Sequence, residues 1–303
     1  MRLLLSTLLL LSLRSTVFAQ TATEPKTYQN FPTGTQMFQA GYIHRTTNST
    51  LDGDIAFDNN TVDIRANVTY LRYARFFNLA GKTAGAQIML PYVGIDADIL
   101  GNNFRQSGFG DMMVILGSNI IGGDAMSVEE LAKTARKTAL AWSLATTTPT
   151  GSYRQERLLN PGGNRWQFKP EIGLTVPSGK WDLEAYVHAK FFTANHAFRV
   201  PDAQDEPLRV TQKPFLGGTF HLVYNWTDKF WISGDVAGRA GGETTKDGVV
   251  QHDSQRILGL GGTVNYGLGR HHQFGLNFIS NAAGNENAPH GAVTGLKYSY
   301  IIN

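Results

Sequence analysis

Cysteine is absent from the 303-residue sequence, so the chain cannot form disulfides, carry a lipid on cysteine or build a thiolate metal site. Long apolar runs are also missing. After the N-terminus no segment reaches the roughly 18 apolar residues that a transmembrane helix needs, which excludes a helical membrane protein. Helix-type periodicity is scarce, and no nucleotide-binding loop is visible. These absences favour an all-β chain without a built-in energy source.

The N-terminus has the features of a secretory signal peptide. Arg2 precedes an apolar run from Leu3 to Leu13, and small side chains precede Gln20. We expect cleavage after Ala19, which divides the chain into a signal peptide, 1–19, and a mature domain, 20–303. Cleavage removes two basic residues and no acidic one, so 27 − 2 = 25 basic residues face 24 acidic ones. This balance does not suggest a nucleic-acid partner.

The dominant pattern is an alternation of apolar and polar residues, which places successive side chains on opposite faces of a strand. It is clear at 62–70, 166–176 and 181–191. A mature chain of this length fits a single barrel domain. At 62–70 the apolar residues are Val62, Ile64, Ala66, Val68 and Tyr70, and the polar residues between them are Asp63, Arg65, Asn67 and Thr69.

Twelve segments read as strands, and an even number is typical of bacterial outer-membrane barrels. Their connections alternate between short turns and long polar loops, and in such barrels the short turns are periplasmic. We expect the last strand to pair with the first, because hydrocarbon cannot hydrate an unpaired edge. The sequence therefore predicts a transmembrane antiparallel up-and-down β-barrel of about twelve strands. The expected strands are 36–46, 61–77, 82–93, 110–121, 137–148, 165–177, 180–192, 215–226, 229–240, 255–268, 271–281 and 292–302.

Two features favour an apolar face toward lipid and a polar face toward a lumen. The polar face mixes acids and bases, which suits a wet interior, and aromatic residues gather near strand ends, as at membrane interfaces. A sandwich with these aromatic side chains in its core is the alternative. The inward charges either select solutes or only pair with one another across the lumen. The predicted lumen-lining residues are Asp63, Arg65, Lys169, Glu171, Asp182, Glu184, His188, Lys190, Asp235 and Arg239.

Local sequence patterns predict the structure of three further segments. A two-residue turn at Ser178-Gly179 would pair residues whose numbers sum to 357, such as Lys169 and His188. Between 122 and 136, a capping box from Ser127 to Glu130 predicts one short periplasmic helix. For residues 20–32 the sequence favours a loose periplasmic tail over a plug in the lumen.

Four short motifs occur together in this chain: GFGD at Gly108 to Asp111, PTG at Pro149 to Gly151, GGNRWQFKP at Gly162 to Pro170, and SVEE at Ser127 to Glu130. With this order the chain resembles the outer-membrane family labelled "putative MetA-pathway of phenol degradation", from about Pro32 onward. The resemblance implies a barrel that passes aromatic or other hydrophobic compounds, with no catalytic or binding residue to carry over. The C-terminal Ile302-Asn303 departs from the aromatic residue on which such barrels commonly finish.

We expect a monomeric, passive channel or transporter for a small-molecule solute, with outer-membrane lipid and the barrel assembly machinery as partners and with no cofactor or metal. The rivals are an outer-membrane lipase or protease and a closed structural barrel. An enzyme would need a nucleophile, a base and an orienting group in reach of one another, and neither His44 nor His272 has an evident serine partner. Asp111 is either a pore-mouth carboxylate or part of a loop-to-strand transition.

Overall fold

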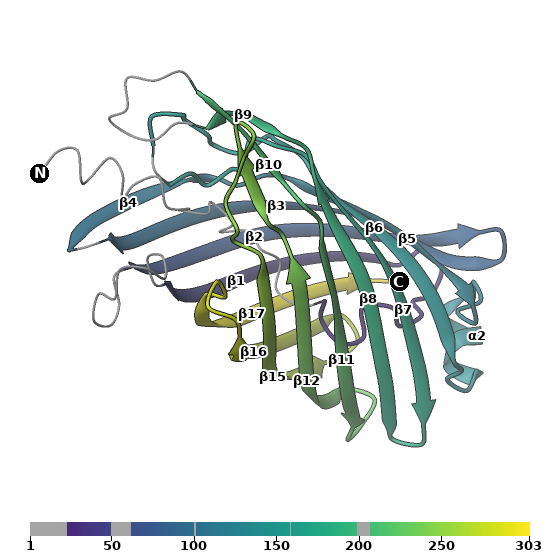
Figure 1. Ribbon diagram of the computed structural model, residues 1–303. Helices are drawn as coiled ribbons and strands as arrows, with labels where there is room; N and C mark the ends of the chain where they lie inside the picture. Colours follow the sequence, from purple (N-terminus) through teal and green to yellow (C-terminus); the bar gives the residue numbers. More distant parts are fainter. Residues whose placement is uncertain (1–22, 50–61, 100, 158, 199–206) are drawn as a thin grey trace, which may run out of the picture.

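A computed structural model describes residues 23–49, 62–99, 101–157, 159–198 and 207–303 (Figure 1). The expected signal peptide, 1–19, lies outside the described residues. Strands of one large sheet form the wall of the molecule, and the described residues include one short helix, α2 (Val128–Lys133). Among the described residues, no helix has the length and apolar character required to cross a membrane.

The large sheet closes on itself as a barrel. β4 and β5 both pair with β3, at successive stretches of that strand, so the thirteen strands of the sheet occupy twelve positions around the ring. The first strand pairs with the last, with Gln36 opposite Ile302. The predicted twelve-stranded antiparallel barrel is confirmed. The wall consists of β1 (Gln36–Ser49), β2 (Val62–Leu79), β3 (Lys82–Ile99), β4 (Asn102–Phe109), β5 (Met113–Ile121), β6 (Ala139–Thr147), β7 (Gln167–Ser178), β8 (Trp181–Phe192), β11 (Phe215–Asn225), β12 (Phe230–Gly241), β15 (Gln255–Leu268), β16 (His272–Gly284) and β17 (His290–Ile302).

The long connections contain strands that the alternation does not reveal. Four of them form a second sheet, which lies at the long-loop end of the barrel (Figure 1). Each has five residues or fewer, too short for a period of two to be recognised. They are β9 (Asn195–Phe198), β10 (Leu208–Gln212), β13 (Thr244–Lys246) and β14 (Val249–Val250).

At the short-turn end, the structure confirms the helix and corrects one register. The capping box is present in α2, where Ser127 accepts from the backbone of Glu130 and Glu130 accepts from the backbone of Ser127. The β7–β8 turn is Gly179-Lys180, with Gly179 at φ +56°, so paired residue numbers sum to 359 rather than 357. His188 therefore lies opposite Glu171 instead of Lys169. A turn that begins at the glycine is favoured because its first position needs a positive φ.

Along most of the wall the apolar face is outward. On β8, Leu183 is 42% exposed while its neighbour Glu184 is 1% exposed, and on β7 Ile172 is 47% exposed while Glu171 is 4% exposed. In water the apolar surface of this ring of outward Leu, Ile, Val and aromatic side chains would remain exposed, which is unfavourable. In contact with lipid the same surface is stable. The barrel is therefore a transmembrane one.

In the parts of β2 and β3 nearest the long loops, here called the upper part of the barrel, the polar face is outward and the apolar face is inward. Both strands have 18 residues, well beyond the roughly 9–11 that span a bilayer, so their ends project beyond the membrane on the long-loop side. An outward aromatic pair, Tyr92 and Phe109 with ring centroids 5.5 Å apart, marks the change. Above it the outer surface meets water and is polar, while apolar residues pack inside. The inner cluster consists of Val62, Val68, Val93, Ile95, Ala97, Ile99 and Leu159.

Two predicted lumen residues are consequently on the wrong face. Asp63 and Arg65 form an ion pair of 3.1 Å on the outer surface, where the Arg65 side chain is 62% exposed. Their apolar neighbour Val62 is buried inside. The alternation at 62–70 is real, but its apolar side faces the interior because this stretch lies beyond the lipid.

Candidate functional site

Residues 23–31 lie inside the barrel and residues 32–35 lie at its short-turn end, which corrects the prediction of a loose tail. Thr23 is the deepest described residue of this stretch, here called the N-terminal segment. Its hydroxyl donates to Glu171 Oε2 over 2.6 Å and accepts from Lys169 Nζ over 2.7 Å. Its carbonyl oxygen lies 2.9 Å from His221 Nε2. The charged side chains of β7 and the His221 ring of β11 thus hold the segment, so the inward charges do not only pair with one another.

Tyr28 fixes the middle of the N-terminal segment. Its hydroxyl donates to Glu171 Oε1 over 2.8 Å and lies 2.8 Å from Ser143 Oγ, and its ring meets Tyr186 edge-on at 5.0 Å. Burial and then the charge of Glu171 raise the pKa of Tyr28, so the phenol keeps its proton and remains a donor. A Cβ on Gly173 would lie 2.3 Å from the Tyr28 ring, so only glycine permits this contact.

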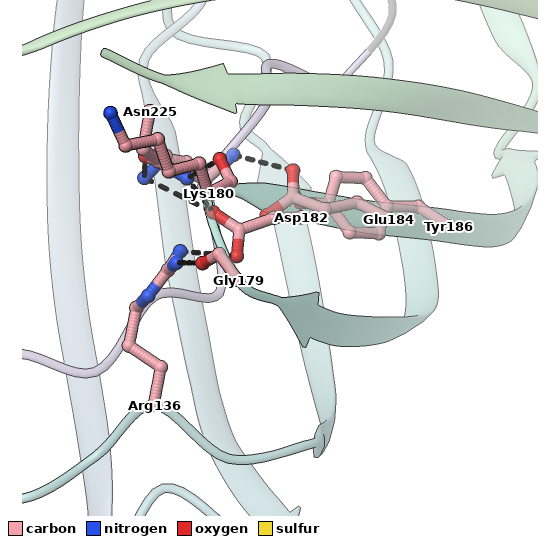
Figure 2. Close-up of polar contacts among 8 residues, drawn as sticks. Arg136, Gly179, Lys180, Asp182, Glu184, Tyr186 and Asn225 are labelled. Carbon is pink, nitrogen blue, oxygen red and sulfur yellow. Dashed lines mark hydrogen bonds and ion pairs between the residues drawn. The ribbon is translucent and has the colours of Figure 1, made fainter. Parts of the chain in front are cut away.

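Lys26 anchors the segment near the short-turn end. Its backbone N–H donates to Glu184 Oε2 over 2.8 Å, and its ammonium lies 3.3 Å from Asp182 Oδ2. Arg136, from the connection that carries α2, reaches the other oxygen of Asp182 and the carbonyl of Gly179 (Figure 2). Burial lowers the pKa of Lys26, and the Asp182 carboxylate opposes that effect. Asp182 and Glu184 therefore serve as anchoring points for the N-terminal segment.

Two further contacts complete the attachment. Glu24 pairs with Lys297 on β17, so the segment is tied to both sides of the ring. Burial alone would raise the pKa of Glu24, but the Lys297 ammonium, together with Arg72, lowers it below its ordinary value. Phe31 stacks on Phe76 at 4.2 Å where the chain leaves the lumen.

One buried cluster has the composition of a catalytic dyad. His221 Nδ1 lies 2.7 Å from Asp235 Oδ1, and Asp235 also accepts from Ser233 and Thr263. The other ring nitrogen faces the Thr23 carbonyl, which is an acceptor and not a nucleophile. Both ring nitrogens thus face oxygen atoms of the protein. The cluster binds the N-terminal segment, and its geometry offers no activated hydroxyl.

Two cavities remain in the lumen beside and above this segment. The lower one, about 210 Å³, lies against Thr23, Glu24 and Tyr28, and its opposite wall includes Met89, Met113, Ile115 and Ala145. The upper one, about 130 Å³, lies between the segment and the long-loop end and is lined by five basic residues and two phenylalanines. Lys169 lines both cavities, so the two spaces meet at this side chain. Within the described chain, no group of three His, Asp or Glu residues is placed to hold a metal ion.

The remaining predicted lumen residues lie on the inner face. Glu171, Asp182, Glu184 and Asp235 are buried and contact the N-terminal segment directly or through His221. The other four, Lys169, His188, Lys190 and Arg239, line the upper cavity. The sequence analysis did not name Arg45 and Arg165, which also line it, because the clear alternation begins at residue 166, after Arg165, and the pattern on β1 is weak.

The three glycine motifs meet around Asp111. This buried carboxylate lies in the break between β4 and β5, and it accepts from the backbone N–H of Gly151 over 2.9 Å and of Gly163 over 2.8 Å. A Cβ on Gly151 or Gly162 would lie under 3.0 Å from Asp111 Oδ1. Burial raises the pKa of Asp111, and the two backbone hydrogen bonds oppose the rise. Asp111 therefore fastens the 148–164 connection to the wall, as the structural alternative predicted.

The barrel is similar to solved outer-membrane structures. The COG4313 outer membrane channel from Pseudomonas putida F1 superposes with a TM-score of 0.79 at 21% identity, covering 92% of this chain and 100% of that chain. The transport unit of the autotransporter AIDA-I from Escherichia coli gives a TM-score of 0.51 at 11% identity, covering 98% and 97%. At these identities the likeness concerns the fold.

No curated protein sequence matches the chain. The family model described as "Putative MetA-pathway of phenol degradation" matches residues 27–295, which include the N-terminal segment from Thr27 onward and the barrel up to the middle of β17. Because this match spans most of the chain, the protein belongs to that family.

Proposed function

We propose that this protein is a passive channel of the bacterial outer membrane for small aromatic or other hydrophobic compounds. The observation that carries the proposal is the pair of cavities that meet at Lys169 inside a closed, lipid-facing barrel. A solute would pass from the upper cavity, beside the N-terminal segment, into the lower one and then to the periplasm. The movement is passive because the segment and the wall contain no nucleotide-binding loop.

The size and lining of the lower cavity suit a single aromatic ring. An apolar cavity of about 150 Å³ holds benzene in another protein, and the lower cavity measures about 210 Å³. Met89, Met113 and Ile115 form an apolar wall opposite the polar residues of the N-terminal segment. A narrow lumen of this kind favours compact, partly apolar solutes over large hydrated ones. The family description and the similarity to the COG4313 outer membrane channel support the same class of function.

Uptake by whole cells tests the proposal, because the outer membrane is the barrier that matters. Cells that lack their own aromatic channels and produce this protein should accumulate labelled benzyl alcohol faster than cells that do not. Ala145 is buried against the lower cavity, so Ala145→Phe should fill that space and return uptake to the background rate.

Ala185→Phe supplies the matched control. Ala185 faces outward on β8, where the larger ring would contact lipid, so uptake should match that of the unaltered protein. Equal uptake with and without the protein would reject the channel and favour a closed structural barrel. Undiminished uptake by folded Ala145→Phe would show that the lower cavity is not on the route.

A further inference from the structure

The upper cavity, which we call the basic chamber, has an unusual charge. Its lining contains Arg45, Arg165, Lys169, Lys190 and Arg239 with His188, and none of its described lining residues is an aspartate or glutamate. Glu171 lies next to the chamber. Its carboxylate is 3.0 Å from the Lys169 ammonium and 3.3 Å from His188 Nδ1, and it also accepts a hydrogen bond from the N-terminal segment. Among the described ion pairs, Glu171 serves Lys169 and His188 and does not extend to Lys190 or Arg165.

Lys190 and Arg165 define the part of the chamber in which the charge is least compensated. Lys190 lies over the Phe192 ring at 5.4 Å from its centroid, and Arg165 lies over the same ring at 4.4 Å. Arg165 also donates to the neutral Gln212 side chain over 2.6 Å. In the part of the chain that the structure describes, neither cation lies within ion-pair distance of a carboxylate. Two like charges that share one ring repel each other, and in a partly buried lumen solvent screens this repulsion poorly.

The same region presents aromatic surface. Phe215 packs edge-on against Phe192 with centroids 6.1 Å apart, and Arg239 lies over Phe215 at 5.1 Å. Gly218, Gly238 and Gly259 also line the chamber and add no side chain to it. Thr219 lines the chamber with a buried hydroxyl that has no hydrogen-bond partner among the described atoms. The chamber thus offers cations, a ring-shaped apolar contact and a free hydroxyl within about 130 Å³.

We propose that the basic chamber is a binding site for aromatic carboxylates of the benzoate class. The carboxylate would lie between Arg165 and Lys190, since guanidinium groups bind carboxylates with two parallel hydrogen bonds, and the ring would pack on Phe192 and Phe215. This inference rests on the proposed channel function and narrows its solute from hydrophobic compounds in general to ring acids. An inorganic anion would satisfy the charge but would leave the aromatic surface unused.

Equilibrium binding to the purified, full-length protein in detergent tests the site. Benzoate and its neutral counterpart benzyl alcohol are titrated by calorimetry at low ionic strength. Benzoate should bind at least about tenfold more tightly, a difference of about 1.4 kcal/mol. Lys190→Met and Arg165→Gln should each reduce benzoate affinity to that of benzyl alcohol, whereas Lys190→Arg, which keeps the charge, should retain it.

Lys180→Met is the matched control, because Lys180 lies exposed in the β7–β8 turn and its loss changes the net charge equally. Its benzoate affinity should not change. Equal binding of benzoate and benzyl alcohol, or unaltered benzoate affinity in folded Lys190→Met, would overturn the inference. Competition by chloride as effective as by benzoate would reduce the site to a general anion site and would also overturn it. Failure of the channel is seen separately, as absent benzyl alcohol uptake by cells.

Discussion

Single buried carboxylates hold this molecule together at points where the strand pattern is interrupted. Asp111 illustrates the case, because both of its oxygens accept backbone hydrogen bonds from a connection some forty to fifty residues further along the chain. Those two N–H groups would otherwise be buried without partners. An unsatisfied buried group costs about 1–3 kcal/mol, so the carboxylate matters more than its small size suggests.

Asp111→Asn should therefore destabilise the protein. The amide keeps one acceptor oxygen but turns an NH2 group toward a backbone donor, so we expect a loss of about 1–3 kcal/mol in the free energy of unfolding. Urea unfolding in lipid vesicles measures it. Asp96→Asn is the control: Asp96 pairs with the exposed Arg105 on the outer surface, and such pairs contribute at most about 1 kcal/mol. Equal losses in both variants would contradict this account of Asp111.

Gly173 is a position at which any larger side chain would displace the N-terminal segment. Gly173→Leu should push Tyr28 aside, because even a Cβ would lie 2.3 Å from its ring, and single-channel conductance should rise several-fold. Gly234→Leu is the control, since nothing lies within 4 Å of a Cβ at that position. An unchanged conductance in folded Gly173→Leu would show that the N-terminal segment does not limit flow.

At the scale of elements, the wall could be predicted and the N-terminal segment could not. A period of two is a local property, so eleven of the expected strands need only shifted ends, and one, 110–121, begins at the break that separates β4 from β5. The β7–β8 register could be predicted only with the correct turn position, and the positive φ of Gly179 determines that position. The segment is held by partners that lie far away in the sequence, such as Glu171 for Thr23, and a stretch without periodicity gives no sign of them.

Face assignment failed for a different reason at Asp63 and Arg65. Alternation separates two faces but does not say which one meets lipid, and the environment of a strand changes along its length. Below Tyr92 the outside is hydrocarbon, and above it the outside is water. Strand length was the available signal, because an 18-residue strand must leave the bilayer.

The N-terminal segment should respond to acid. Glu24 has a lowered pKa in the folded state, so its pairing with Lys297 is complete above the ordinary value of 4.5 and is lost as the pH falls through the lowered pKa. We expect conductance to rise as the pH falls below about 4.5. Glu24→Gln has no charge to lose, so its conductance should already be higher at pH 7 and rise less in acid. Identical pH profiles for the two proteins would contradict this role for Glu24.

At the scale of the whole molecule, the barrel has an apolar outer wall, a charged inner wall and a lumen largely filled by its own N-terminal segment. The charges on the inner wall have two tasks: acids near the short-turn end bind the segment, and bases toward the long-loop end line the basic chamber. This division places the remaining space along one side of the segment. The proposed route of the solute runs through that space.

Chemical modification of a single thiol tests this claim most directly, because the native chain has no cysteine. Ala145→Cys places a thiol in the lower cavity, and Ala185→Cys places one on the lipid-facing wall. A cationic methanethiosulfonate reagent is added during single-channel recording, and its attachment is verified by mass spectrometry. The account predicts a stepwise fall in conductance for labelled Ala145→Cys and no change for labelled Ala185→Cys. An unchanged conductance after verified labelling of Ala145→Cys would contradict it.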